Sequence, residues 1–280
     1  MRTLIADSGA TKTDWLYVDG NEFVQVQTQG LHPATLAVDN DELEIRDLVG
    51  EFNPEVVHFY GAGCGNPVSD EIIKRFLSPI FPESKIIIRT DLEGCGKAFY
   101  GDGSGIVAIL GTGSICAKIE NGNVTNKSAS LGYAVGDEGS AADIGRRLLK
   151  IYYRRDSDDD TSNFIGEKLG HIEYGDMMNQ IYSSAKPNRE LASVAGNVLI
   201  PPFPDELNKT VKKAFSDFIK CQLSQLSLNK NEDIIFTGKV ALAHKEILLD
   251  EMKSFGYENV KVLYPVISAW RERLKQNKNN

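Results

Sequence analysis

The chain has 280 residues, a formal net charge of −8, 41% hydrophobic residues and 25% charged residues. Its length suits two domains of ordinary size, and its composition is typical of a globular protein. The acidic charge argues against nucleic acid as the main partner, and no apolar run approaches the length that spans a membrane.

The cysteines and histidines are scattered along the chain. None of the four cysteines follows a Cys-x-x-Cys spacing, and the four histidines are equally dispersed, so no zinc site is expected. The N-terminus reaches Asp7 too soon to hold a secretory apolar segment. These features predict reduced thiols in a cytoplasmic protein.

The first predicted strand, residues 4–7, ends in an acid and enters a turn of small residues. The turn reads Ser8-Gly9-Ala10-Thr11-Lys12-Thr13, and a second apolar run follows it. Such a turn lets backbone N–H groups approach an anion, while threonine hydroxyls and a lysine add donors. The Asp7 carboxylate would repel a phosphate unless a divalent cation lay between them, which favours Asp7 as a ligand of Mg²⁺ or of its water. A hairpin that binds nothing is the alternative.

The same design recurs about a hundred residues further on. A strand at residues 105–110 enters Gly111-Thr112-Gly113-Ser114, a strand at 115–119 follows, and Asn121-Gly122 makes a hairpin turn. The first copy likewise continues through Asp19-Gly20 into another strand. Two similar units that each offer a phosphate turn predict two lobes facing one polyphosphate.

Apolar periodicity predicts the remaining elements. Ser69 is expected to cap the second helix, with Ile72, Ile73, Phe76 and Leu77 on its inner face. The expected helices are residues 39–52, 69–77, 93–100, 140–154, a mostly helical region 164–228 broken at Pro201, 240–255 and 267–275; the further strands are 56–60, 85–90, 233–237 and 260–263.

Three segments carry a resemblance to a known family: the first turn, the turn at 111–114, and Gly-Asp-Glu-Gly-Ser-Ala at 136–141. They resemble the sugar kinases of the actin/hexokinase/Hsp70 superfamily, and most of all the N-acetylglucosamine kinase group of the BadF/BadG ATPase family. The resemblance spans most of the chain and is best between about Thr90 and Ala142.

The resemblance implies an α/β fold of two actin/hexokinase-like (ribonuclease H-like) lobes. Each lobe would be a mixed sheet flanked by helices, with the active site in the cleft between them. The N-terminal lobe would span residues 1–102 and the C-terminal lobe residues 103–265, with a last helix, 266–280, packing back on the first lobe.

The resemblance also implies roles for individual residues. Asp91, which ends a buried strand, could cap the next helix, but the match favours it as the general base. Asp137 and Glu138 precede a helix, where acids are favoured by the dipole; the match places Asp137 at sugar hydroxyls, and Glu138 could hold the turn. The residues expected at ATP and its phosphates are Asp7, Ser8, Gly9, Thr11, Lys12, Thr13, Gly111, Thr112, Gly113, Gly238, Val240 and Ala241. Those expected at the sugar are His32, Ser114, Gly132 and Asp137.

Three positions depart from the family pattern. His32 stands before Pro33 where relatives commonly carry Asn, and Lys239 replaces a Ser in the adenosine turn. The segment before Gly132 is also poorer in Gly and aromatic residues than usual. Two of the three departures lie on the sugar side, so the phosphate chemistry is better supported than the sugar.

The predicted function is ATP- and Mg²⁺-dependent phosphorylation of an amino sugar, with N-acetylglucosamine at O6 as the first choice. Two alternatives stay open. One is an ATPase that activates a radical dehydratase through an iron–sulfur cluster, although the cysteines lack cluster-like spacing. The other is a non-catalytic protein that senses nucleotide or sugar. The expected partner is a small-molecule sugar, and a homodimer is compatible with the sequence.

Overall fold

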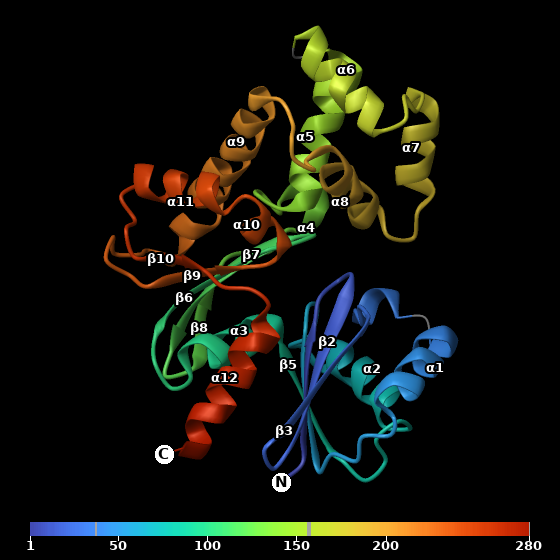
Figure 1. The fold of residues 1–280 in the computed structure, drawn as a ribbon, viewed down its shortest axis with the longest axis vertical. Coiled ribbons are helices and arrows are strands. Elements are labelled where there is room, and N and C mark those ends of the chain that lie inside the picture. The colour runs from blue at the N-terminus through green and yellow to red at the C-terminus, as the bar shows by residue number, and fades with distance from the viewer. Residues whose placement is uncertain (37, 156–157, 280) are drawn as a thin grey trace. The chain divides into compact units, whose positions relative to one another are not determined.

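The computed structural model describes residues 1–36, 38–155 and 158–279. The chain divides into two compact units (Figure 1). Unit 1 comprises residues 1–104, 119–124 and 264–280, and unit 2 comprises residues 105–118 and 125–263. Among the described residues, no helix combines the length and the apolar character needed to cross a bilayer.

Unit 1 is built on a five-stranded mixed sheet. Its strands are β1 (Thr3–Ser8), β2 (Lys12–Asp19), β3 (Glu22–Gln29), β4 (Val56–Gly61) and β5 (Lys85–Thr90), in the order β3-β2-β1-β4-β5. The first three strands pair antiparallel, whereas β1, β4 and β5 run parallel. Short hairpins join the antiparallel strands, and helices connect the parallel ones, as parallel pairing requires.

Helices cover both faces of the unit 1 sheet. On one face, α1 (Val38–Val49) and α2 (Pro67–Leu77) pack on Leu4, Ala6 and the fully buried Trp15. On the other, α3 (Asp91–Tyr100) and α12 (Val266–Asn279) lie side by side (Figure 1). A single-turn helix, η1 (Pro33–Thr35), follows β3.

Unit 2 repeats this sheet. Its strands are β6 (Gly105–Leu110), β7 (Ser114–Glu120), β8 (Asn123–Lys127), β9 (Ile234–Thr237) and β10 (Val260–Val262), in the order β10-β9-β6-β7-β8. Read from the first strand of each unit, the two orders are identical, and β6, β9 and β10 run parallel as β1, β4 and β5 do. The predicted architecture of two mixed sheets flanked by helices is confirmed.

Unit 2 carries more helices than unit 1. They are α4 (Gly132–Val135), α5 (Ala141–Arg154), α6 (Asp159–Lys168), α7 (Tyr174–Ser183), α8 (Pro187–Val198), α9 (Asp205–Cys221), η2 (Leu223–Leu226), α10 (Lys239–Ala243) and α11 (Lys245–Ser254). The predicted helix at residues 140–154 is confirmed as α5, with Ser140 as its N-cap. The predicted break at Pro201 falls between α8 and α9.

Several local predictions were wrong. Asn66, not Ser69, caps α2, because its side chain accepts the Ser69 N–H while Pro67 occupies the first helical position. Ile72 is 38% exposed, whereas Ile73, Phe76 and Leu77 are buried as expected. The helix predicted at residues 240–255 is two helices, α10 and α11, which meet at His244.

Candidate functional site

The predicted phosphate turn of unit 1 connects β1 to β2. The Gly9 N–H donates to the Lys12 carbonyl at 3.0 Å, and the Gly30 N–H donates to the Thr11 carbonyl at 3.0 Å. A Cβ on Gly30 would lie 2.4 Å from the Gly9 carbonyl oxygen and 2.8 Å from the Lys12 nitrogen. Only glycine permits so close an approach, so the end of β3 forms a backbone support beneath the turn.

The hydroxyls of Ser8 and Thr13 are used inside the protein. Both residues are fully buried, and their oxygens lie 2.7 Å apart. Ser8 Oγ also donates to the Leu31 carbonyl at 3.0 Å, and the Leu31 N–H lies within bonding distance of both hydroxyls. These two predicted site residues therefore shape the turn and tie it to the chain after β3, rather than present hydroxyls to a ligand.

Lys12 is held by an internal ion pair. Its Nζ lies 2.5 Å from Asp14 Oδ2, and Gln27 Nε2 donates to the other Asp14 oxygen at 2.6 Å. The ammonium also lies over the Tyr264 ring, 5.3 Å from its centroid. Burial alone would lower the pKa of Lys12, but hydrogen bonds to Asp14 and Tyr264 raise it. Lys12 is thus protonated and compensates Asp14 in this state, which differs from the predicted contact with phosphate.

Asp7 is the most strongly perturbed carboxyl of the turn. Burial, then the charge of Asp91, then that of Asp14 raise its pKa from 3.8 to about 7, and only Lys12 opposes them. The charge of Asp91, the residue that follows β5, therefore acts on the Asp7 carboxyl of β1. Such an arrangement favours a bound cation, which would offset the repulsion.

The fit of Mg²⁺ at Asp7 follows from the chemistry of this donor set. Within the described part of the chain, no group of three or more His, Cys, Asp or Glu side chains could hold a metal by itself. Mg²⁺ usually keeps several waters and is bound by one or two carboxylates together with substrate phosphates. Asp7 fits that pattern, because burial and the charge of Asp91 both disfavour its ionised form unless a cation is bound.

Asp91 is the first residue of α3. Thr90 forms the N-cap: its hydroxyl accepts the Glu93 N–H at 3.2 Å, and the Glu93 side chain accepts the Thr90 N–H at 2.9 Å. Because this capping box satisfies the helix end, the alternative that Asp91 serves as the N-cap is wrong. Its Oδ1 accepts the Leu92 N–H at 2.9 Å.

His32 caps the short helix η1. Its Nδ1 accepts the Ala34 N–H at 3.2 Å, which leaves the ring proton on Nε2. The ring packs on Gly63, where an added Cβ would lie 2.6 Å from Nε2. His32 therefore accepts the Ala34 N–H as an Asn side chain could at this position, and its imidazole ring is bulkier than the Asn amide.

In unit 2, the turn between β6 and β7 docks on the start of α5. The N–H groups of Ala141 and Ala142 donate to the carbonyls of Gly111 and Thr112 at 2.9 and 3.2 Å. A Cβ on Gly113 would lie 2.9 Å from Asp137 Oδ2, so the Asp137 carboxylate lies against the turn. Burial raises the pKa of Asp137, although the Ser114 N–H opposes the shift.

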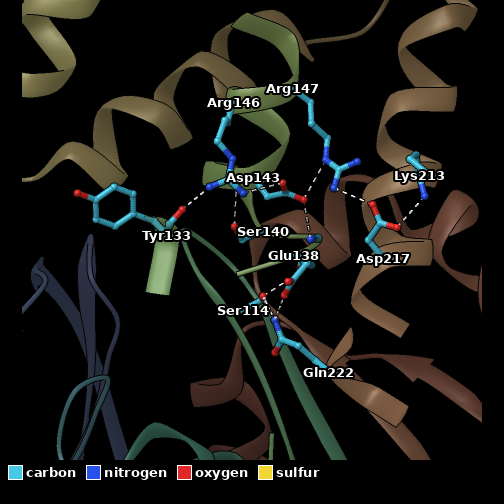
Figure 2. A network of polar contacts seen from close by, with 11 residues as sticks. Ser114, Tyr133, Glu138, Ser140, Asp143, Arg146, Arg147, Lys213, Asp217 and Gln222 are labelled. Carbon is cyan, nitrogen blue, oxygen red and sulfur yellow. Dashed lines mark hydrogen bonds and ion pairs between the residues drawn. The ribbon is translucent and has the colours of Figure 1, made fainter. Parts of the chain in front are cut away.

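Ser114 and Glu138 are joined by a buried network (Figure 2). Ser114 Oγ donates to the Glu138 carbonyl at 2.8 Å and accepts from Gln222 Nε2 at 2.8 Å. Gln222 Nε2 also donates to Glu138 Oε2 at 3.0 Å. The Ser114 hydroxyl therefore donates its proton to the turn at Glu138 and has none left to donate to a sugar.

A second set of contacts holds the same turn from the α5 side (Figure 2). Asp143 Oδ2 accepts the Gly139 N–H at 3.1 Å, and both Asp143 oxygens pair with arginines, Arg146 and Arg147, at 3.0 Å. Arg146 also donates to the Tyr133 carbonyl in α4. The spacing of an acid followed by arginines three and four residues later is a signal that sequence reasoning missed.

The remaining predicted residues lie near the turn at 111–114 or beside α4. Gly238 has φ = +103°, and a Cβ there would lie 2.2 Å from the Leu110 carbonyl, so this turn packs on the end of β6. Val240 and Ala241 in α10 are buried. Gly132 begins α4 with φ = +72°.

A cavity of about 750 Å³ lies between α4, α5 and α9. None of the predicted site residues lines it. It contains the side chains of Arg147 and Lys213, but both pair with Asp217, at 2.9 and 2.8 Å. Most of the charged side chains that line the cavity are paired, so we do not assign the active site to it.

Two mixed sheets with the same strand order, each with a tight turn at the end of its first strand, match the actin/hexokinase-like fold. A solved structure of a candidate N-acetylglucosamine kinase from Porphyromonas gingivalis matches with a TM-score of 0.85 and 27% identity, over 96% of both chains. A second candidate N-acetylglucosamine kinase, from Chromobacterium violaceum, has a TM-score of 0.72 over 93% of this chain and 94% of that one, with 17% identity, and shows the fold alone.

By sequence, the chain is 26% identical to an N-acetylmuramic acid/N-acetylglucosamine kinase from Clostridium acetobutylicum over 214 residues, which cover 72% of this chain and 70% of that protein. No protein-family model matches the chain. The predicted resemblance to N-acetylglucosamine kinase-like proteins is confirmed, and with it the predicted class of enzyme, a sugar kinase.

Proposed function

We propose that the protein transfers the γ-phosphoryl group of ATP to a hydroxyl of an amino sugar, with O6 of N-acetylglucosamine as the acceptor. The observation that carries the proposal is the pair formed by Asp7 and Asp91, because the charge of Asp91 helps to raise the pKa of Asp7 to about 7. Perturbed carboxyls beside a phosphate-binding turn are typical of catalytic sites. The similarity to the Clostridium acetobutylicum kinase supports the choice of sugar.

Asp91 acts as the general base in this mechanism. Its carboxylate takes the proton of the attacking hydroxyl while the oxygen bonds to the γ-phosphorus and the bond to ADP breaks. The position of Asp91 at the start of α3 supports the role, since the capping box of Thr90 and Glu93 fixes the backbone on which Asp91 lies.

Asp7 and the two glycine-rich turns bind the nucleotide. Asp7 would hold Mg²⁺ or its water, which would supply charge neutralisation at the phosphate oxygens. In unit 1, the backbone of the turn between Ser8 and Thr13 lies at phosphate with Thr11 as a further donor, while Lys12 stays paired with Asp14. In unit 2, Gly111, Thr112 and Gly113 bind phosphate, and Gly238, Val240 and Ala241 lie at the adenosine.

The sugar contacts fall to His32, Gly132 and Asp137, while the Ser114 hydroxyl, bonded to Glu138 and Gln222, holds the turn beside them. The Asp137 carboxylate already lies against Gly113, which suits a residue that binds sugar hydroxyls next to a phosphate turn. The Clostridium acetobutylicum relative carries both N-acetylmuramic acid and N-acetylglucosamine in its name, so N-acetylmuramic acid is the second acceptor we propose. The reaction would take place in the cytoplasm.

The test measures ADP release from ATP·Mg²⁺ against a panel of amino and neutral sugars. We expect stimulation by N-acetylglucosamine, its abolition in Asp91→Asn, and nucleotide binding that stays intact in that variant. Asp102→Asn, an exposed acid of unit 1, is the matched control and should behave as the parent protein. Full activity in Asp91→Asn would refute the assignment of the base, and no response to any sugar would refute the proposed reaction.

The relatives' names favour the kinase over the two alternatives, a radical-dehydratase activator and a non-catalytic sensor. The four cysteines are free thiols, as expected from their spacing. Mapping the phosphorylated carbon of the product would test the O6 assignment separately.

A further inference from the structure

Gln222 lies at the end of α9 and connects three segments of unit 2. Its side chain is 2% exposed, and each of its polar atoms has a partner. Nε2 donates to Ser114 Oγ at 2.8 Å and to Glu138 Oε2 at 3.0 Å, while Oε1 accepts from Ser128 Oγ at 3.2 Å. Ser128 Oγ in turn accepts the Cys116 N–H of β7 at 3.1 Å.

Two of these partners belong to the turns that hold predicted site residues. Ser114 follows Gly111–Gly113 directly, and Glu138 follows Asp137. Ser114 Oγ also donates to the Glu138 carbonyl, so Gln222 binds both ends of an existing link between the two turns (Figure 2). Fixing Glu138 through both its carbonyl and its side chain fixes the orientation of the preceding residue, Asp137, whose φ is +56°.

The chemistry of the site calls for a primary amide. Nε2 donates to the Glu138 carboxylate and to the Ser114 hydroxyl, whose own proton is already donated to the Glu138 carbonyl. Both partners therefore accept, and the position needs one atom that carries two N–H donors. The amide orientation follows from this network, because Oε1 meets the Ser128 hydroxyl. A carboxylate in place of the amide would face Glu138 in a buried environment, and an apolar side chain would leave buried polar atoms without partners.

We propose that Gln222 is a positioning residue that fixes Asp137 against the turn at Gly111–Gly113, acting through Ser114 and Glu138. The proposal rests on the proposed function, in which Asp137 binds the sugar and the turn binds phosphate. Gln222 itself touches neither ligand. Its loss should therefore impair transfer to the sugar more than it impairs nucleotide binding.

The test compares Gln222→Met and Gln222→Glu with a control, Gln225→Met. Gln225 lies three residues further on in η2 and is exposed; its side chain accepts the Ala129 N–H and donates to the Cys221 carbonyl. At a temperature where all variants are folded, we expect sugar-dependent kcat/KM to fall about 10- to 100-fold in Gln222→Met and further in Gln222→Glu. The Kd for nucleotide and the sugar-independent hydrolysis of ATP should change less than about threefold, and Gln225→Met should match the parent.

A charge swap distinguishes positioning from a loss of stability. In the double variant Glu138→Gln/Gln222→Glu the donor and the acceptor change places, so it should recover at least about tenfold of the kcat/KM lost in Gln222→Glu alone. Equal losses in sugar transfer and in nucleotide binding, or a double variant no better than Gln222→Glu, would overturn the proposal.

Amide hydrogen exchange tests the same contact without any turnover. In Gln222→Met the amides of Gly139 and Ser140 should exchange faster than in the parent, and in Gln225→Met they should not. Unchanged exchange in Gln222→Met would overturn the proposal even if the kinase is active. If the parent protein phosphorylates no sugar, the proposed function fails, and the exchange measurement alone then decides whether Gln222 fixes the turn.

Discussion

Replacing Asp7 by Asn should stabilise the protein while it removes activity. The folded state holds the pKa of Asp7 at about 7, above its ordinary 3.8, so the folded protein binds more protons than the unfolded chain between these values. Stability contributed by the protonated carboxyl is therefore complete below about pH 4 and is lost as the pH rises through 7. A shift of this size corresponds to about 4 kcal/mol of repulsion and desolvation above that window.

The solvent contact that Asp7 retains reduces this figure, so we expect Asp7→Asn to raise the free energy of unfolding by about 2–4 kcal/mol near pH 8. Near pH 5, where the parent is already mostly protonated at this site, the gain should be less than half as large. The corresponding rise in Tm near pH 8 is on the order of 5–10 °C.

The measurement is thermal or urea unfolding of the ligand-free protein at both pH values. Asp19→Asn, an exposed acid at the end of β2, is the control and should show no such pH-dependent gain. Addition of ATP·Mg²⁺ should stabilise the parent more than Asp7→Asn, since the cation offsets the same repulsion. An Asp7→Asn variant that gains no stability near pH 8, or gains as much near pH 5, would refute the electrostatic reasoning.

Three further substitutions test the framework of unit 1. Gly30→Ala forces a Cβ to within 2.4 Å of the Gly9 carbonyl, so it should cost about 1–3 kcal/mol in urea unfolding and raise the Kd for ATP. Arg273→Met removes two 3.0 Å hydrogen bonds to the last carbonyls of α3, and we expect a loss of about 1–2 kcal/mol with little effect on Kd. Trp15→Phe removes the indole N–H bonded to Thr28 at 2.9 Å and opens a void in a fully buried site, for a loss of about 1–3 kcal/mol.

The sheets were predictable because their information is local. In each unit the sequence of the first hairpin shows two apolar strands separated by a glycine-containing turn, and this pattern occurs twice along the chain. The N-cap of α2 was predicted wrongly as Ser69, although Asn66 before Pro67 is the stronger start signal. The division of residues 239–254 at His244 was not predictable, because neither glycine nor proline marks it.

The candidate site was predictable only in its turns. Local sequence pointed to Asp7 and the glycines, and the family resemblance to Asp91, but neither predicted the hydrogen bonds that their neighbours make. Ser8 and Thr13 look like phosphate ligands in the sequence, yet their hydroxyls bind Leu31. Gln222 lies 108 residues from Ser114, and no local pattern connects such a pair. Contacts of this kind depend on how the elements pack, which periodicity does not encode.

A substitution at His32, where the sequence departs from the pattern of the N-acetylglucosamine kinase group, tests whether this residue contacts the sugar. Its Nδ1 accepts the Ala34 N–H at 3.2 Å, and an Asn at this position, with its Oδ1 in the same role, would cap η1 equally well. His32→Asn should therefore change the free energy of unfolding by no more than about 0.5–1 kcal/mol.

The substitution removes the imidazole that packs on Gly63 and leaves space there. If His32 contacts the sugar, the KM for the acceptor should change severalfold and the ranking of the sugar panel should shift, with the Kd for ATP unchanged. Steady-state kinetics across the panel measures both effects. An identical ranking with identical KM values would show that His32 only caps η1 and that the specificity for the acceptor lies elsewhere, with Asp137 as the next residue to test.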